Sequence, residues 1–212
     1  RIIRNKLYLM SNNIIDWKSR KYQQNIIDDG INLLERQKKF YLELATGGGK
    51  TYIVFQILKY FQPDTIICFS PRKKINIQNI NNKYLGILGN EYKEFNFSVD
   101  KDFDTFYKSS NKKIISACIQ SFKQIHQKII DLKMKNVFIW FDESHWAIEE
   151  TWLPDLHQNN TKKFFLEDNE VITNRLFTSA SPNLEIVKDN PEIFGNLLSP
   201  IKIKDLIKLE WL

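Results

Sequence analysis

A glycine-rich loop lies between two segments of regular hydrophobic pattern. Residues 45–51 read Ala-Thr-Gly-Gly-Gly-Lys-Thr, after an apolar run at 40–44 and before an apolar-periodic segment that begins at Thr51. Glycines let successive backbone N–H groups turn towards a phosphate, and the start of a helix adds its positive dipole end. The pattern is typical of a Walker A loop, in which Lys50 reaches the β and γ phosphates and the Thr51 hydroxyl binds Mg²⁺. The residues that we predict to bind the phosphates are Thr46, Gly47, Gly48, Gly49, Lys50 and Thr51.

Two adjacent carboxylates end another apolar run. Residues 137–141 are followed by Asp142 and Glu143, and carboxylates at the C-terminal end of a parallel strand project into the crevice where such sheets bind ligands. An acidic pair alone can be a solvated turn, but the phosphate-binding loop in the same chain favours catalysis. We expect Asp142 to hold Mg²⁺ together with Thr51, and Glu143 to orient and deprotonate the attacking water. The predicted catalytic residues are therefore Lys50, Asp142 and Glu143, and the predicted cofactors are ATP and Mg²⁺.

These residues must be positioned by a sheet. Apolar runs rich in β-branched and aromatic residues occur at 40–44, 65–69, 114–118, 137–141 and 175–178. They are unbroken, as expected of parallel strands covered on both faces. Helical patterns lie between several of them, at 51–61, 75–84 and 119–132. This alternation predicts an α/β fold with a mostly parallel sheet and helices on both faces. Residues 94–99 could add a strand, and 86–113 and 157–174 otherwise look irregular.

Composition narrows the class of protein only coarsely. The 212 residues suit one large domain, and the net charge of +6 favours a polyanionic partner, although a mild excess is usually a solvated surface. Cys68 and Cys118 both lie in apolar runs, which argues against a disulfide or a zinc site and favours a reducing compartment. No apolar stretch approaches the roughly 20 residues that cross a bilayer. We expect a soluble, intracellular protein of the cytoplasm, nucleoid or nucleus that is not secreted and has no membrane partner.

The loop at 45–51 and the Asp-Glu-Ser-His sequence at 142–145 together resemble motifs I and II of the superfamily 2 helicases and translocases. They look like the DEAH-like branch, which includes the motor subunits of type I and type III restriction enzymes. The resemblance implies a RecA-like P-loop domain that hydrolyses ATP to drive movement on nucleic acid, with DNA favoured over RNA. It extends from about Arg20 to Leu212. Leu44 departs from the general Walker A pattern, which has Gly at that position.

A segment before the loop resembles a third motif of this family. Residues 20–23, Arg-Lys-Tyr-Gln, are similar to the R-x-Y-Q segment that opens the domain. The resemblance implies that Gln23, together with Arg20, binds the nucleotide base, since an amide offers both the donor and the acceptor that the adenine edge needs. The alternative is an exposed helix start.

Two further segments resemble the nucleic-acid motifs of the family. Residues 70–74, Ser-Pro-Arg-Lys-Lys, resemble motif Ia, and residues 116–121 resemble a T-x-Q-S segment with Cys118 in place of the usual Thr. Basic residues at a helix start can bind phosphates, but a lysine-rich helix cap in solvent is the plainer alternative. The residues implied to contact nucleic acid are Pro71, Arg72, Lys73, Gln78, Gln120 and Ser121.

Residues 177–182, Phe-Thr-Ser-Ala-Ser-Pro, resemble motif III. The resemblance implies that the hydroxyls of Thr178, Ser179 and Ser181 bond to the acidic motif and sense the γ-phosphate, and that His145 couples the nucleotide site to them. A Ser/Pro turn is the alternative.

The domain boundaries follow from the same resemblance. We expect an N-terminal extension at 1–19 and the first RecA-like domain at 20–212, with residues 201–212 leading towards a second RecA-like domain that is absent from this chain. Two other functions stay open. One is a translocase that never separates strands, and the other is an ATP-switched nucleic-acid-binding module without unwinding activity. A P-loop kinase or GTPase fits poorly, because no guanine-reading Asn-Lys-x-Asp segment follows the acidic motif.

Overall fold

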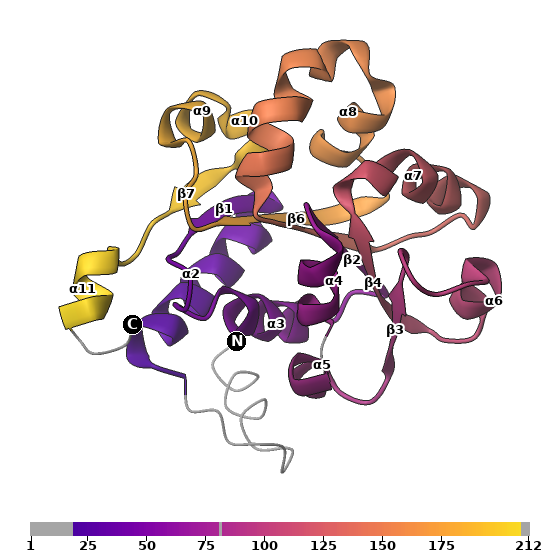
Figure 1. Ribbon diagram of the computed structural model, residues 1–212, viewed down its shortest axis with the longest axis horizontal. Helices are drawn as coiled ribbons and strands as arrows, with labels where there is room; N and C mark the ends of the chain where they lie inside the picture. The colour runs from indigo at the N-terminus through magenta and orange to yellow at the C-terminus, as the bar shows by residue number, and fades with distance from the viewer. Residues whose placement is uncertain (1–18, 81, 209–212) are drawn as a thin grey trace.

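The fold is a seven-stranded parallel sheet between two layers of helices (Figure 1). The computed structural model describes residues 19–80 and 82–208. The strands are β1 (Lys39–Glu43), β2 (Thr65–Ser70), β3 (Tyr92–Asn96), β4 (Lys112–Cys118), β5 (Val137–Asp142), β6 (Ile172–Ser179) and β7 (Asn196–Leu198). Their order is β3-β4-β2-β5-β6-β1-β7, and every paired strand is parallel to its neighbour. All C-terminal strand ends therefore meet at one edge of the sheet, which confirms the predicted fold class.

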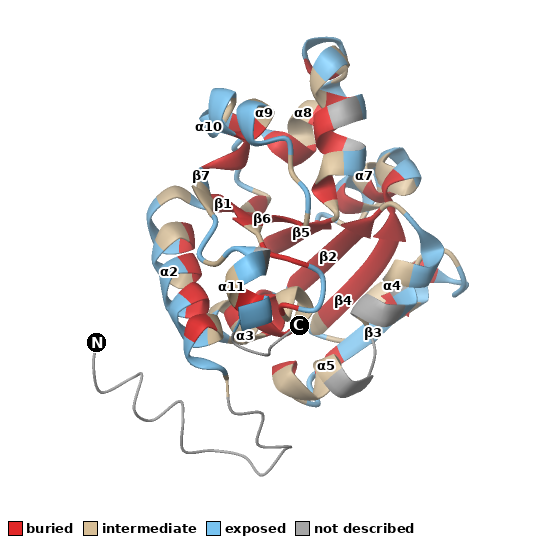
Figure 2. Ribbon diagram, turned by 60° about the vertical axis from the view of Figure 1, so that its left-hand side comes forward, coloured by how far each residue is buried: buried red, intermediate tan, exposed pale blue. Residues whose placement is uncertain are grey.

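Alternation along each strand divides the core into two. Successive side chains of a strand point to opposite faces, so Phe138 and Trp140 of β5 enter one apolar cluster and Ile139 and Phe141 enter the other. Figure 2 shows the central strands β4, β2 and β5 buried along their length. Because both faces are covered, these strands read as unbroken apolar runs in the sequence.

Each cluster is closed by its own set of helices. The first set is α2 (Lys21–Gln37), α3 (Lys50–Phe61), α5 (Asn82–Leu88) and α11 (Ile203–Lys208). The second set is α6 (Phe103–Lys108), α7 (Phe122–Asp131), the π-helix η2 (His145–Trp152), the 3₁₀ helix η3 (Leu153–Gln158), α8 (Asn160–Leu166), α9 (Leu184–Asp189) and α10 (Pro191–Phe194). Two short helices, α4 (Lys73–Asn79) and η1 (Ile119–Ser121), follow β2 and β4. Among the described residues, no helix is both long enough and apolar enough to span a bilayer.

Several predicted elements differ in their bounds. The single helix expected at 75–84 is two helices, α4 and α5, and the strand expected at 94–99 is β3, which begins and ends earlier. The stretches expected to be irregular contain α6 and α8. Asp102 accepts a hydrogen bond from the Thr105 N–H at the start of α6, and Asn159 accepts one from the Lys162 N–H at the start of α8. These helices are short, and their N-caps are the signal that the hydrophobic pattern missed.

Candidate functional site

The loop between β1 and α3 is held in a shape that glycine permits. Gly47 has a φ of 83° and Gly49 a φ of 90°, a region that residues with a Cβ rarely adopt. A Cβ on Gly48 would lie 2.8 Å from Cγ of Leu44, which fills the position where the Walker A pattern has glycine. The Gly48 N–H donates to the Ala45 carbonyl at 3.0 Å and closes the turn. Since α3 begins at Lys50, the N–H groups of its first turn lie at the mouth of this loop.

The loop and the acidic motif meet at Lys50. Its Nζ donates to the Leu44 carbonyl at 3.0 Å and lies 3.6 Å from Oε1 of Glu143. Glu143 has a φ of 49°, a left-handed conformation that costs energy for a residue with a side chain. This strained turn follows β5 directly. The structure therefore brings together the predicted phosphate-binding lysine and the predicted water-activating carboxylate, which lie far apart in the sequence.

Asp142 is buried at the end of β5 and is fixed by its neighbours. Oδ1 of Asp142 accepts hydrogen bonds from the Thr178 hydroxyl at 2.9 Å and from the Glu143 N–H at 3.1 Å. The Thr178 oxygen in turn accepts from Nε1 of Trp140 at 2.9 Å. Thr178 thus ties β6 to β5 directly at the predicted metal ligand, and two hydrogen bonds fix one oxygen of the carboxylate.

His145 lies between the acidic motif and the loop after β6. Its Nδ1 is 2.7 Å from the Ser179 hydroxyl and 3.6 Å from Oε2 of Glu143. The Ser181 N–H donates to the same Ser179 oxygen at 3.0 Å. Of the four residues that the sequence suggested for coupling, His145, Ser179 and Ser181 therefore form one chain of contacts that reaches Glu143, and Thr178 contacts Asp142 separately.

A second polar network lies beneath this one, and sequence reasoning missed it. The Tyr41 hydroxyl in β1 donates to Oε1 of Glu149 at 2.6 Å and accepts from the Ser144 hydroxyl at 2.8 Å. Oε2 of Glu149 accepts from the Asn183 N–H at 2.7 Å. Burial, followed by the bond to Glu149, raises the pKa of Tyr41 far above its ordinary value. Buried carboxylates are almost always paired, as Glu149 is here, but the sequence around Glu149 gives no sign that it is buried.

Gln23 and Arg20 lie at the start of α2, beside the loop. Oε1 of Gln23 accepts from the Arg20 N–H at 3.0 Å, and Nε2 donates to the Gly48 carbonyl at 3.3 Å. A Cβ on Gly49 would lie 2.4 Å from this Nε2 atom. The neighbouring Tyr22, which was not predicted, donates its hydroxyl to the same Gly48 carbonyl at 2.7 Å. The Arg-Lys-Tyr-Gln segment thus stabilises the glycine loop by two hydrogen bonds to the Gly48 carbonyl.

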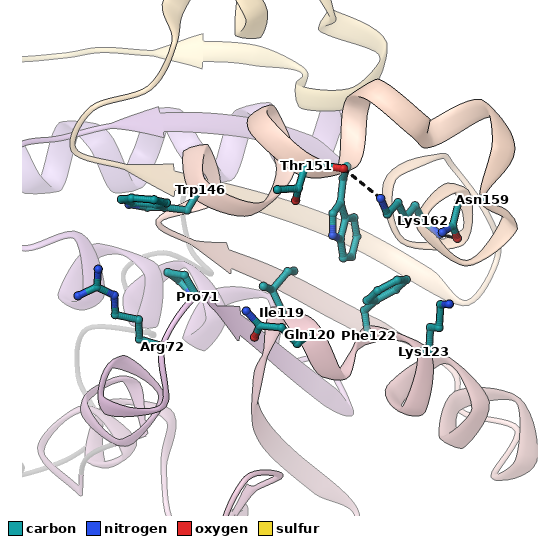
Figure 3. Close-up of a pocket in the computed structure, with 11 residues that line it drawn as sticks. Pro71, Arg72, Ile119, Gln120, Phe122, Lys123, Trp146, Thr151, Asn159 and Lys162 are labelled. Carbon is teal, nitrogen blue, oxygen red and sulfur yellow. Dashed lines mark hydrogen bonds between the residues drawn. The ribbon is translucent and has the colours of Figure 1, made fainter.

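A groove of about 550 Å³ is lined by residues that follow β2, β4 and β5 (Figure 3). Three residues suggested for nucleic-acid contact, Pro71, Arg72 and Gln120, line its lower wall in that view. Lys73 is exposed at the start of α4, and Ser121 ends η1 without lining the groove. The side chain of Gln78 lies outside the described part of the structure.

The opposite wall of the groove was not predicted. It is made by residues of η2, of the turn before α8 and of α8 itself, among them Trp146, Asn159 and Lys162. Lys123 of α7 extends the lower wall. Lys123 and Trp146 lie close after segments that the sequence had indicated, at 116–121 and 142–145, whereas nothing in the local pattern distinguishes Asn159 and Lys162 from surface residues.

A sequence model of the family described as "Type III restriction enzyme, res subunit" matches residues 16–168. This chain belongs to that family. The matched residues include the glycine loop and the acidic motif, and they end before β6. No curated protein matches the sequence significantly.

Solved structures of restriction enzymes and helicases share the fold of this chain. The type ISP enzyme LlaGI, solved with a DNA substrate mimic, is 15% identical with a TM-score of 0.70, over 92% of this chain and 21% of that one. UvsW helicase from bacteriophage T4 is 15% identical with a TM-score of 0.61, over 92% of this chain and 66% of that one. Dbp5 from S. cerevisiae, bound to RNA and ADP-BeF3, is 14% identical with a TM-score of 0.61, over 88% and 47%. The chain thus spans about a fifth of LlaGI and just under two thirds of UvsW.

Family membership makes this chain a helicase-type ATPase domain and implies nucleotide binding, and its fold is the one that the solved helicases share. The residues present fit Mg²⁺-bound ATP on structural grounds. The loop has two glycines with positive φ and a lysine at its mouth. At the end of β5, Asp142 is buried and has one oxygen already fixed. Because hard cations prefer carboxylate and hydroxyl oxygens, Asp142 and Thr51 offer the donor types that Mg²⁺ binds.

Proposed function

We propose that this chain is the ATP-binding part of a motor that hydrolyses ATP to move on nucleic acid. The observation that carries the proposal is the 3.6 Å approach of Lys50 Nζ to Oε1 of Glu143. A cation that can bind phosphate then lies beside a carboxylate that can activate water, which is the pairing that phosphoryl transfer to water needs. Family membership supports the link from hydrolysis to movement on nucleic acid.

The proposed roles divide the site into binding and chemistry. Backbone N–H groups of the glycine loop and the Lys50 ammonium would bind the phosphates, and Thr51 with Asp142 would hold the metal. When bound there, Mg²⁺ would neutralise part of the phosphate charge. Glu143 accepts the proton of the attacking water, and His145 positions Glu143 through its contact with Oε2. Gln23, with Arg20, would bind the base. To do so, Gln23 would give up its hydrogen bond to the Gly48 carbonyl and form one to the base instead.

Nucleotide binding can be tested separately from hydrolysis. Lys50→Ala should abolish binding of a non-hydrolysable ATP analogue with Mg²⁺, because its ammonium is the cation at the mouth of the loop. Isothermal titration calorimetry measures the affinity, and Lys188→Ala, an exposed lysine of α9, is the matched control. Equal affinity in Lys50→Ala and wild type would contradict the role of the loop.

We propose that the nucleic acid is DNA and that it binds in the groove of about 550 Å³. The family description names a restriction enzyme, and the neighbour LlaGI was solved with a DNA substrate mimic. Arg72 and Gln120, which line the groove with Pro71, would contact phosphates there, and we propose that Lys73, Gln78 and Ser121 also contact the nucleic acid. Both cysteines are buried inside the sheet, which suits a reducing, intracellular location.

We also propose that the motor needs a second RecA-like domain. Residues 20–212 would form the first domain, with 1–19 as an extension, and the second would supply the opposite wall of the nucleotide site. An arginine finger from such a wall contributes about 10³ to 10⁵ in rate in related phosphoryl-transfer enzymes. The chain by itself should therefore hydrolyse ATP slowly and should not translocate on nucleic acid.

The proposed function is tested by following phosphate release from ATP with and without added DNA or RNA. We expect slow release by the 212-residue chain, stimulation when a protein that also contains the second domain is used, and a larger effect of DNA than of RNA. Tight ATP binding without turnover in the two-domain protein would favour the ATP-switched binding module instead.

A further inference from the structure

Trp146 is an exposed tryptophan directly after the acidic motif. About 52% of its surface is accessible, the largest exposed fraction of any large aromatic side chain in the described residues. Tryptophan is highly buried on average, and its flat, amphipathic ring is used for contact when it is exposed. In Figure 3 the ring lies at one end of the groove, across from Pro71 and Arg72.

The groove around Trp146 has the charge of an anion-binding site. Arg72, Lys123 and Lys162 line it, and no carboxylate is among its described lining residues. Lys162 is largely neutralised, because it forms an ion pair with Asp155. Arg72 and Lys123 remain on the lower wall, spread along the length of the groove (Figure 3). Cations along a groove with an aromatic ring at one end are the features that bind single-stranded nucleic acid.

We infer that Trp146 is a stacking platform for a nucleobase of a single strand that passes through this groove. Arg72 and Lys123 contact the phosphates, and the indole ring stacks on one base. In a duplex both faces of a base are already covered by neighbours, so the ring selects an unpaired base. The inference rests on the proposed function, since it assigns the nucleic-acid strand to this groove.

Trp146 also connects the bound nucleic-acid strand to the nucleotide site. The backbone N–H of Trp146 donates to the Glu143 carbonyl at 3.2 Å. The centroid of the Trp146 ring lies 5.8 Å from that of the His145 ring. His145 also contacts Glu143 and Ser179, in both cases through Nδ1. A base that holds Trp146 in place therefore also restrains the turn that carries the predicted water-activating carboxylate. Stacking should consequently affect hydrolysis as well as binding.

The test compares Trp146→Ala, Trp146→Phe and wild type for binding of a fluorescein-labelled oligo(dT) by anisotropy. Because base–aromatic stacking measured by alanine substitution corresponds to between about fivefold and about 150-fold in affinity, Trp146→Ala should lose at least about fivefold. Trp146→Phe keeps a stacking ring and should lose much less. Tyr60→Ala removes another exposed aromatic, at the far end of α3, and should bind like wild type.

A spectroscopic readout separates stacking from a loss of structure. Wild-type tryptophan emission should be quenched when unlabelled oligo(dT) binds, and the quenching should be largely lost in Trp146→Phe. A blunt-ended duplex of the same length should quench far less. Far-UV circular dichroism melts of each variant verify the fold.

The outcomes distinguish the two proposals. If Trp146→Ala binds oligo(dT) like wild type while Arg72→Ala binds more weakly, the stacking inference is wrong and the groove still binds nucleic acid. If quenching persists in Trp146→Phe, the base lies against another residue and the inference is again wrong. If the wild-type chain binds neither single-stranded nor duplex nucleic acid, the proposed function itself fails.

Discussion

The Thr178 hydroxyl donates a hydrogen bond of 2.9 Å to Oδ1 of Asp142, from one strand of the sheet to the next. Thr178 is fully buried, and its oxygen also accepts from Nε1 of Trp140. Thr178→Val keeps the shape of the side chain but removes its hydrogen bonds to Asp142 and to Trp140. We expect the free energy of unfolding to fall by about 1–3 kcal/mol, the cost of leaving a buried polar group unsatisfied. Urea unfolding measures it.

Thr161→Val, near the start of α8, is the control for this substitution and should change stability little. Thr178→Val should also weaken the binding of Mg²⁺-ATP more than that of ATP in EDTA, because the carboxylate it fixes is the proposed metal ligand. Unchanged stability in Thr178→Val would mean that this bond contributes nothing measurable.

Glu143→Gln separates binding from chemistry. The amide cannot accept the proton of water, while Lys50 and the glycine loop stay intact, so ATP affinity should be within a few-fold of wild type. A general base contributes about 10² to 10⁴ in rate, and hydrolysis in a protein that contains both domains should fall by that factor. Glu170→Gln, an exposed glutamate before β6, is the control. Wild-type hydrolysis by Glu143→Gln would move the base to another residue.

Tyr41 should make the protein less stable at alkaline pH. Burial and the bond to Glu149 raise the pKa of Tyr41, so the native state keeps a proton that the unfolded chain loses above about pH 10. Since the unfolded state then binds fewer protons, the free energy of unfolding falls as pH rises above 10. Tyr41→Phe removes this contribution and should show a shallower fall between pH 10 and 11.

Urea unfolding of Tyr41→Phe and wild type at pH 8, 10, 10.5 and 11 checks this. The other tyrosines are common to both proteins and cancel in the difference. At pH 8 the variant should be the less stable of the two, because the buried carboxylate of Glu149 loses its donor from β1. Parallel curves over the whole range would show that Tyr41 ionises normally in the native state.

Arg72 should contribute to nucleic-acid affinity in a way that depends on salt and not on sequence. A phosphate contact that is lost lowers the slope of log affinity against log salt by about 1. We expect this change in Arg72→Ala for oligo(dT) and for a mixed sequence alike, measured by anisotropy between 50 and 200 mM salt. Lys188→Ala should keep the wild-type slope. Altered sequence preference with an unchanged slope would point to a base contact.

The sheet and the two carboxylates could be predicted because their signals are local. The run before Asp142 is continuously apolar and the run before the glycine loop is interrupted only by Glu43, and each is followed by residues of the expected type. The Tyr41 to Glu149 bond could not be predicted in this way. It joins residues whose sequence neighbours give no indication of each other, and it depends on the register between β1 and the π-helix.

The groove was predicted only on one wall for the same reason. Pro71 and Gln120 follow strands, where sequence patterns are informative, whereas Trp146 lies in a π-helix whose geometry no simple periodicity reveals. Sequence also placed α8 in an irregular stretch, because a helix of one or two turns carries too little pattern.

The position of β1 in the sheet constrains the order in which the site can assemble. Its two neighbours are β6 and β7, which begin at residues 172 and 196, although β1 itself ends at residue 43. Pairings between distant parts of a chain form late, because loop closure must precede them. During synthesis the glycine loop therefore emerges early, but the strand before it, β1, stays unpaired until β6 has left the ribosome. Nascent chains halted before residue 172 should be protease-sensitive at the loop and unable to retain nucleotide.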